Sequence, residues 1–324
     1  MRPFRFTAVT SFEQLGQRSP QSSYLAGGTT LVDLMKLEVM TPDELIAIDQ
    51  LPLRGVGEDA DGLRIGALET MSAVAAHPAV VSGYEAISQA LLQSASPQLR
   101  NMATIGGNLL QRTRCSYFRD TNSACNKRVP GSGCPAINGE NRMLAILGTS
   151  SSCIATNPSD LAVALVALDA QVHLRGQGRT RTVALRDFYL EPGDRPDREN
   201  VLEPGELITE VTVPRPPVGA KTGYVKVRDR ASYEFALTSA AVVLSMDGDR
   251  VRKAEVAVGG VGTRPWLLPN VGAALNGRTL DRPSLEAAAA LAANGAKRYS
   301  DNGFKVELMQ RTVIRAFSQL GGLV

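Results

Sequence analysis

The sequence predicts an α+β protein of two or three domains. The chain has 324 residues, and one domain commonly holds about 100–200 residues. Strand-like segments are interspersed with segments of helical period, and 44% of the residues are hydrophobic, enough to bury a large core. The proline-rich stretch PRPPVG at 214–219 predicts a boundary. We therefore expect a larger domain over about 1–215 and a smaller α+β domain over 220–324.

Local patterns predict the elements of the larger domain. Strands are expected at 4–10, 24–26, 42–51 and 63–71, and helices at 11–18 (with Ser11 as N-cap), 31–40 and 70–95, the last with a break at His77-Pro78. Residues 96–111 are predicted as a loop. Next comes a long irregular insertion over about 112–153, rich in Asn, Ser, Gly and Pro. Loops of that length inside a domain are usually functional or disordered.

The chain after the insertion is expected to return to regular structure. Residues 152–176 predict a short strand, a turn, a helix and a strand, and the alternating LITEVTV predicts a strand over 207–213. In the smaller domain we expect strands within 222–246 and 250–262 and two helices from about Ser284 onward.

Charge and hydropathy argue against several classes of function. The net charge is +3, with 35 basic and 32 acidic residues spread along the chain, so nucleic acid is not an expected partner. The N-terminus lacks the apolar core and cleavage site of a secretory signal, and no apolar stretch is long enough to span a bilayer. Export in the company of another subunit stays open.

Two Gly-Gly pairs and one aspartate predict a site for a diphosphate and its sugar. Gly27-Gly28 lies between a predicted strand and helix, where glycine permits close approach and helix-start amides can face an anion. Thr29 and Thr30 add hydroxyl donors, and ATIGGNL at 103–109 repeats the pattern. Asp160 in TNPSD is able to accept hydrogen bonds from sugar-like hydroxyls. The alternatives are two ordinary turns and a helix N-cap at Asp160.

The absence of two nucleotide-binding motifs narrows the kinds of nucleotide site that are expected. No GxGxxG follows a predicted strand and no GxxxxGK[ST] occurs, which argues against Rossmann and P-loop nucleotide sites. The only histidines are His77 and His173. We expect both to be structural, and we do not expect a histidine-based catalytic or metal centre.

Five motifs in order resemble one family, the FAD-binding medium subunits of the molybdenum hydroxylases, or xanthine dehydrogenase family. They are AGGTTLVDLMK (26–36), ATIGGNL (103–109), TNPSDLAVAL (156–165), EPGELITEVTVP (203–214) and YVKVRDRASYEFALTSAAV (224–242). The resemblance covers nearly the whole chain. It implies a two-subdomain FAD-binding fold of the p-cresol methylhydroxylase and vanillyl-alcohol oxidase type, followed by a C-terminal α+β domain of the CO dehydrogenase flavoprotein type. The cysteine insertion is similar to that of FAD subunits of bacterial periplasmic aldehyde oxidoreductases.

The resemblance also implies which residues bind FAD. The diphosphate would be held by Ala26, Gly27, Gly28, Thr29, Thr30 and Leu31, with Thr104, Gly107 and Asn108 completing the cradle. Asp160 would bind FAD hydroxyls and Ile208 would pack near the flavin. Lys226 would lie near the ring and stabilise negative charge on its reduced form. The alternative for Ile208 is an ordinary core position, and for Lys226 a solvated surface position.

All four cysteines of the chain lie in the insertion, at Cys115, Cys125, Cys134 and Cys153. Three interpretations follow from the residues alone: buried bystander thiols, two disulfides, and four thiolates around zinc or an iron–sulfur cluster. The surrounding polar residues argue against bystanders, and the spacing does not distinguish zinc from a cluster. Arg112, Arg114, Lys127 and Arg128 either lower the cost of a negatively charged cluster or face a partner or solvent.

The resemblance implies a [4Fe–4S] cluster, because aldehyde oxidoreductase FAD subunits and relatives resembling benzoyl-CoA reductase carry one on such an insertion. It further implies a heterotrimer. A large molybdenum-cofactor subunit would oxidise an aldehyde to a carboxylate with water, and a small [2Fe–2S] subunit would pass electrons to FAD here and on to an external acceptor. No catalytic acid or base is expected in this chain. Co-export would place the complex in the periplasm; the alternative is the cytoplasm.

Two other functions stay open on the residues alone. One is a stand-alone flavin oxidoreductase of the same fold, which needs its own substrate pocket. The other is a non-catalytic binding module whose fold is stabilised by a structural zinc ion.

Overall fold

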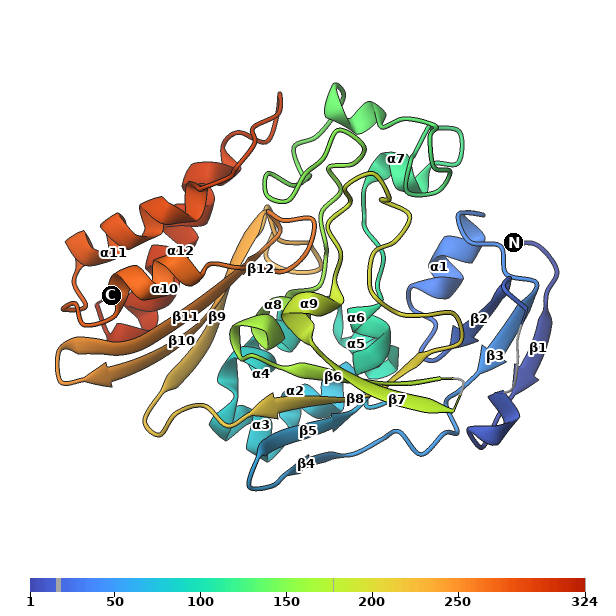
Figure 1. The fold of residues 1–324 in the computed structure, drawn as a ribbon, viewed down its shortest axis with the longest axis horizontal. Helices are drawn as coiled ribbons and strands as arrows, with labels where there is room; N and C mark the ends of the chain where they lie inside the picture. Colours follow the sequence, from blue (N-terminus) through green and yellow to red (C-terminus); the bar gives the residue numbers. More distant parts are fainter. Residues whose placement is uncertain (16–18, 177, 324) are drawn as a thin grey trace.

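The computed structural model describes residues 1–15, 19–176 and 178–323. Three sheets and the helices packed on them make up the chain, with the insertion forming a separate group of loops at one end (Figure 1). The predicted α+β class is confirmed. No helix among the described residues is both long and apolar enough to cross a bilayer.

The N-terminal sheet is small and parallel, with strand order β1-β3-β2. Its strands are β1 (Arg5–Ala8), β2 (Ser22–Leu25) and β3 (Glu44–Ala47), and helix α1 (Leu31–Lys36) follows β2. The predicted helix over 31–40 ends early, because Glu38 takes a positive φ of 56°. The predicted helix over 11–18 is a 3-10 turn at Glu13–Leu15, and residues 16–18 lie outside the described part of the chain.

The central sheet is antiparallel and has strand order β4-β5-β8-β6-β7. These strands are β4 (Val56–Glu58), β5 (Gly62–Gly66), β6 (Gln171–Gly176), β7 (Arg179–Ala184) and β8 (Leu207–Pro214). The helices packed with it are α2 (Met71–Ala76), α3 (Pro78–Gly83), α4 (Glu85–Leu92), α8 (Asp160–Ala167) and α9 (Leu185–Phe188). The predicted break at His77-Pro78 is confirmed, since Pro78 begins a new helix. His173 hydrogen-bonds Thr212 and Thr182 across the strands, as a structural residue would.

The predicted loop over 96–111 is wrong. The segment forms two short helices, α5 (Pro97–Met102) and α6 (Ile105–Leu109). Each begins at a side-chain cap, because the Ser96 hydroxyl accepts the amide of Leu99 and the Thr104 hydroxyl accepts the amide of Gly107. The Gly-Gly pair suggested a turn, but the caps and Pro97 at the first helical position determine the local structure.

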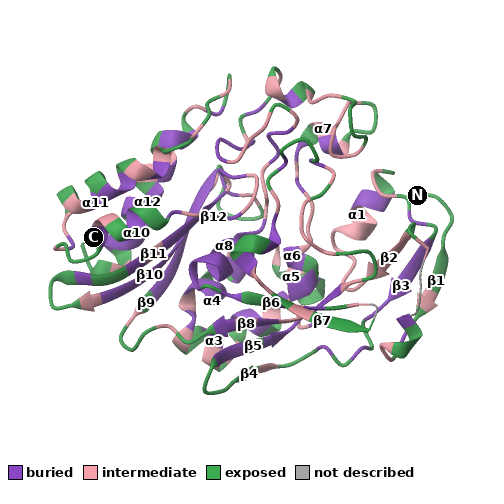
Figure 2. Ribbon diagram, in the orientation of Figure 1, coloured by how far each residue is buried: buried purple, intermediate pink, exposed green. Residues whose placement is uncertain are grey.

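The C-terminal sheet has the order β12-β11-β10-β9. Its strands are β9 (Lys221–Val227), β10 (Thr238–Asp247), β11 (Arg250–Gly259) and β12 (Trp266–Leu267). One face packs against α10 (Pro269–Leu275), α11 (Arg282–Ala290) and α12 (Lys305–Gly321). The other face meets α8, whose residues are all buried (Figure 2). Helix α8 therefore lies between two sheets, which places its first residue, Asp160, at the junction of the two.

The insertion is mostly irregular, with one helical turn, α7 (Ser116–Arg119), and a 3-10 turn at Pro135–Ile137. The short strand predicted after Ser152 does not form; the amide of Ala145 donates to Ile154, but the described residues 153–155 join no sheet. The insertion also contacts the C-terminal domain. Its Asn141 side chain donates to Ser300 of the C-terminal domain, and Lys305 of α12 donates to the carbonyls of Leu144 and Gly260.

We expect Lys305 to make stability depend on pH. Burial lowers its pKa to about 7, with Arg142 acting in the same direction and Asp229 opposing. Between about pH 7 and 10 the unfolded chain binds a proton on this lysine that the folded chain has lost, so the free energy of unfolding rises with pH in that window. Urea unfolding of wild type and Lys305→Met across this range isolates the effect; equal slopes in the two proteins would contradict it.

Candidate cofactor-binding site

The first Gly-Gly pair forms the connection between β2 and α1. Gly28 has a φ of +71°, which favours glycine. A Cβ placed on Gly27 would lie 1.9 Å from the carbonyl oxygen of Met102 and 3.2 Å from Cα of Ala103. The loop over 26–31 therefore packs directly against the junction of α5 and α6, and the two glycine pairs, far apart in sequence, are neighbours in space.

The amides at the start of α1 are available to a ligand. Among the hydrogen bonds of the described residues, none has the backbone amide of Thr29, Thr30 or Leu31 as its donor, and Thr30 caps the helix without a side-chain bond. The loop is half-buried along its length. Free amides at a helix start are suited to anionic oxygens. The residues present therefore fit a diphosphate group.

The amides around the second Gly-Gly pair, unlike those of the first loop, donate hydrogen bonds within the protein. The amides of Ile105 and Gly106 donate to the carbonyls of Glu69 and Ala67, and the amide of Gly107 donates to the Thr104 hydroxyl at 3.2 Å. Its contribution is to position side chains next to the first loop. Asn108 is buried, and its Oδ1 accepts a 2.7 Å hydrogen bond from the hydroxyl of Ser159, which links α6 to the start of α8.

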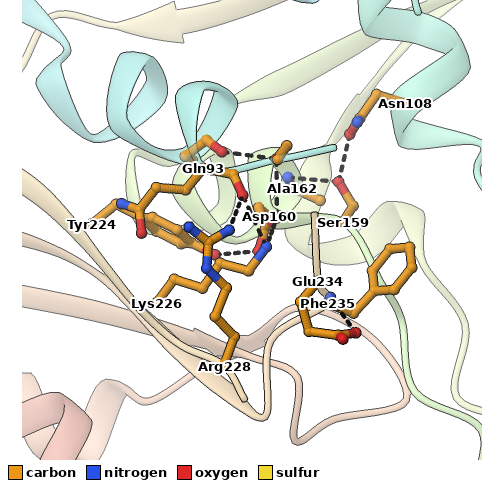
Figure 3. A network of polar contacts seen from close by, with 12 residues as sticks. Gln93, Asn108, Ser159, Asp160, Ala162, Tyr224, Lys226, Arg228, Glu234 and Phe235 are labelled. Carbon is orange, nitrogen blue, oxygen red and sulfur yellow. Dashed lines mark hydrogen bonds and ion pairs between the residues drawn. The ribbon is translucent and has the colours of Figure 1, made fainter. Parts of the chain in front are cut away.

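Asp160 lies at the centre of a buried polar network (Figure 3). Its carboxylate accepts hydrogen bonds from Tyr224 (2.5 Å), Lys226 (2.7 Å) and Ser94 (3.0 Å). The Lys226 side chain is only 1% exposed and also donates to the carbonyl of Gln93. Lys226 is therefore not a solvated surface residue. The alternative that Asp160 is the N-cap of α8 is wrong, because Ser159 caps α8 by accepting the amide of Ala162.

Tyr224 acts as a hydrogen-bond donor in this network. Burial raises the pKa of Tyr224 well above its usual value, and the negative charge of Asp160 adds to the effect. The phenol therefore stays protonated and donates to Asp160. A buried ion pair is retained only where further hydrogen bonds satisfy its remaining atoms. Tyr224 and Ser94 supply them here.

A cavity of about 170 Å³ lies beside Asp160. Its lining comes from the insertion, α8, β10 and the loop before β10, and includes Arg114, Cys115, Asp160, Glu234, Phe235 and Ser239. The Ser239 hydroxyl is buried and has no hydrogen-bond partner among the described residues. Ile208 is buried in β8 opposite Leu174 and belongs to the core around α8 rather than to the lining of this cavity.

Gly27→Ala is expected to damage this site. Its methyl group would overlap the Met102 carbonyl, so we expect a loss of at least about 2 kcal/mol in the free energy of unfolding and loss of bound flavin. The matched control is Gly83→Ala, where an added Cβ meets nothing within 4 Å. Chemical denaturation and flavin content measure both variants; wild-type stability and flavin in Gly27→Ala would show that the close approach is unimportant.

The four cysteines are brought together by the insertion. All are free thiols and all four line one small pocket, with Cys115 and Cys153 buried. Burial raises the pKa of Cys115 to about 11 and also raises the pKa of Cys134 and Cys153. Among the described residues no three metal-binding side chains are close enough to hold a single ion. Metal binding would require these thiols to lose their protons.

The four basic residues near the cysteines all have partners within the chain. Arg112 and Lys127 both pair with the half-buried Glu199, at 2.8 and 2.9 Å. Burial pushes the pKa of Glu199 up, but these two cations outweigh it and the net shift is downward. Arg114 pairs with Asp33, and Arg128 donates to the carbonyls of the α7 turn. These contacts anchor the insertion to the rest of the chain.

Sequence reasoning missed four residues of this region: Asp33, Ser94, Glu199 and Tyr224. Tyr224 had a signal, because it stands two residues before Lys226 in a strand and so shares its face. The other three have none, since each meets its partner across more than 60 residues of sequence.

Two family models cover almost the whole chain. The FAD binding domain in molybdopterin dehydrogenase matches residues 2–216, and the CO dehydrogenase flavoprotein C-terminal domain matches residues 223–320. The chain therefore belongs to the FAD-binding medium subunits of the molybdenum hydroxylase family, and it is a subunit of an oxidoreductase complex.

Individual relatives agree with the family. The chain is 49% identical to the aldehyde oxidoreductase FAD-binding subunit PaoB of Escherichia coli, over 94% of this chain and 92% of that protein. It is 29% identical to the carbon monoxide dehydrogenase medium chain of Afipia carboxidovorans, over 88% and 81% of the two chains. The solved CO dehydrogenase from Oligotropha carboxidovorans superposes over 100% of both chains with a TM-score of 0.79 at 26% identity.

Proposed function

We propose that the chain is the FAD-carrying electron-transfer subunit of a molybdenum-dependent aldehyde oxidoreductase, which converts an aldehyde and water to a carboxylate. The observation that carries this proposal is the 49% identity to an aldehyde oxidoreductase FAD-binding subunit over 94% of the chain. The free amides of the 26–31 loop support it, because they offer a diphosphate the donors that no protein group uses among the described residues.

The residues of the chain would share the work of holding FAD. The loop Ala26–Leu31 would bind the diphosphate, and Thr104, Gly107 and Asn108 would fix the wall against which that loop packs. Asp160 still has one acceptor position for a cofactor hydroxyl beyond the three that are used. Lys226 would place a positive charge near the ring, and Ile208 would support the site from the core rather than line it. When bound, the flavin supplies the redox chemistry that exchanges single electrons and electron pairs.

We further propose that Cys115, Cys125, Cys134 and Cys153 bind a [4Fe–4S] cluster. Their convergence on one pocket supports four thiolate ligands, and the absence of a disulfide among the described cysteines leaves all four available. Such a cluster supplies one-electron transfer when bound. The positive charge of Lys127 opposes the rise that burial causes in the pKa of Cys153.

The proposed partners are a large molybdenum-cofactor subunit and a small [2Fe–2S] subunit in a heterotrimer, with an external electron acceptor. The medium-chain relatives belong to multi-subunit enzymes by name, which supports the assembly. We propose a periplasmic complex exported through a partner's signal, with the cytoplasm as the alternative, and a domain division near residues 215–220.

The test is to purify the complex through a tag on this chain and add an aromatic or aliphatic aldehyde without oxygen. We expect molybdenum in the complex and aldehyde-dependent loss of flavin absorbance. A free single chain that reduces a small substrate by itself would favour the stand-alone flavin enzyme. A colourless protein that contains zinc and no flavin would favour the binding module.

A further inference from the structure

Helix α1 touches both proposed cofactor sites. Its first residue, Leu31, carries one of the free amides of the 26–31 loop, and its third residue, Asp33, contacts the insertion. The Asp33 carboxylate accepts hydrogen bonds from Arg114 at 2.9 Å and from both terminal nitrogens of Arg119 at 2.9 and 3.1 Å. Two arginines of the insertion therefore pair with the same carboxylate of α1.

These arginines flank a cysteine of the proposed cluster. Arg114 is the residue before Cys115, and Arg119 ends the α7 turn, where its amide donates to the carbonyl of Cys115 at 3.1 Å. A shift of Cys115 therefore moves both partners of Asp33. The bidentate pair between Arg119 and Asp33 resists such a shift, because bidentate pairs fix orientation as well as distance.

An apolar contact links the same two elements. Leu34, the residue after Asp33, is 1% exposed and packs in one hydrophobic cluster with Cys115, Phe118 and Cys153. On the other side of the junction, the Arg114 guanidinium lies 5.2 Å from the ring of Phe235, which lines the cavity beside Asp160. The insertion and the flavin region thus share a polar and an apolar contact through α1.

We propose that flavin binding and metal loading of the cysteine site are energetically coupled through α1, with Asp33 as the positioning residue. This proposal rests on the proposed function. Metal bound to the four thiolates would fix the position of the α7 turn. The α7 turn in turn fixes α1 through Asp33 and Leu34. The amides of the 26–31 loop at the start of α1 are then preorganised for FAD. Coupling between sites is reciprocal, so bound FAD strengthens retention of the metal by the same factor.

The experiment measures the dissociation constant of FAD, by flavin fluorescence, for the purified full chain with its iron present and after anaerobic removal of the iron by a chelator. For wild type we expect FAD to bind at least about fivefold more tightly to the iron-loaded chain, the lower end of typical coupling. Asp33→Asn keeps the shape of the side chain and removes its charge. It should bring the ratio of the two constants well below that of wild type, with the Leu34 contact left in place.

Asp229→Asn is the matched control. Asp229 receives a bidentate pair from Arg142 of the insertion, at 2.7 and 3.0 Å, but it belongs to the C-terminal domain and not to α1. Its ratio should equal that of wild type. If Asp33→Asn does not retain iron, Arg119→Gln takes its place; it leaves Asp33 with Arg114 and should reduce the ratio partially.

The outcomes separate the two proposals. A wild-type chain that binds no FAD or no iron contradicts the proposed function. A wild-type chain that binds both with a ratio of one contradicts the coupling alone, as does an unchanged ratio in both Asp33→Asn and Arg119→Gln.

Discussion

Cys125→Ser is expected to lose nearly all iron from the protein. Cys125 is one of four thiols that line the pocket, and a neutral hydroxyl does not replace a thiolate as a ligand of iron. The substitution leaves no cavity, so the loss would reflect ligation rather than packing. Iron and acid-labile sulfide per chain are the measurements, and we expect both to fall close to background.

The same variant should also loosen the insertion. Metal ligation can order a loop that forms little regular structure by itself. Loss of the metal should therefore loosen the insertion, and we expect faster proteolysis within 112–153. Ser151→Ala, at an exposed serine of the same segment, is the control and should keep wild-type iron. A full iron content in Cys125→Ser would remove this cysteine from the ligand set.

Lys226→Met is expected to cost about 3 kcal/mol in the free energy of unfolding. Removal of one partner of a buried ion pair leaves the other charge buried without compensation, and both side chains here are almost fully buried. Tyr224 and Ser94 still donate to Asp160, which places the loss at the lower end of the usual range for such variants. Urea unfolding of the flavin-free chain measures it without interference from the cofactor.

Two companion variants make this result specific. Lys253→Met removes an exposed lysine that pairs with Glu255, and it should change stability by less than about 0.5 kcal/mol. The double variant Asp160→Asn with Lys226→Met removes both charges and should recover part of the lost stability. A Lys226→Met protein as stable as wild type would mean that Asp160 carries no charge in the folded chain.

The proposed flavin region has a signature in the sequence because its residues sit in local motifs. Gly27 and Gly28 are dictated by a positive φ and a close backbone approach, and such requirements leave a mark in the sequence. The order of five short motifs then identified the family and, through it, the fold. The motif around Asp160 drew attention to the start of α8, but the N-cap there is its neighbour Ser159.

The rest depends on contacts between distant segments. Whether the 96–111 segment forms helices depends on two capping hydroxyls, those of Ser96 and Thr104. The Gly-Gly pair in the same segment is typical of a turn, so residue types alone predict a loop there. The insertion looked like a free loop because its own residues form little regular structure. Its anchors, Glu199 and Asp33, lie 87 and 81 residues from their arginine partners Arg112 and Arg114. No local pattern predicts such pairs.

The most direct test of the account is the absorption spectrum of the purified chain, with quantitative flavin, iron and zinc analysis. The account predicts one FAD and about four irons per chain, with no stoichiometric zinc. A chain without flavin, or with zinc in place of iron on the four thiols, would contradict it.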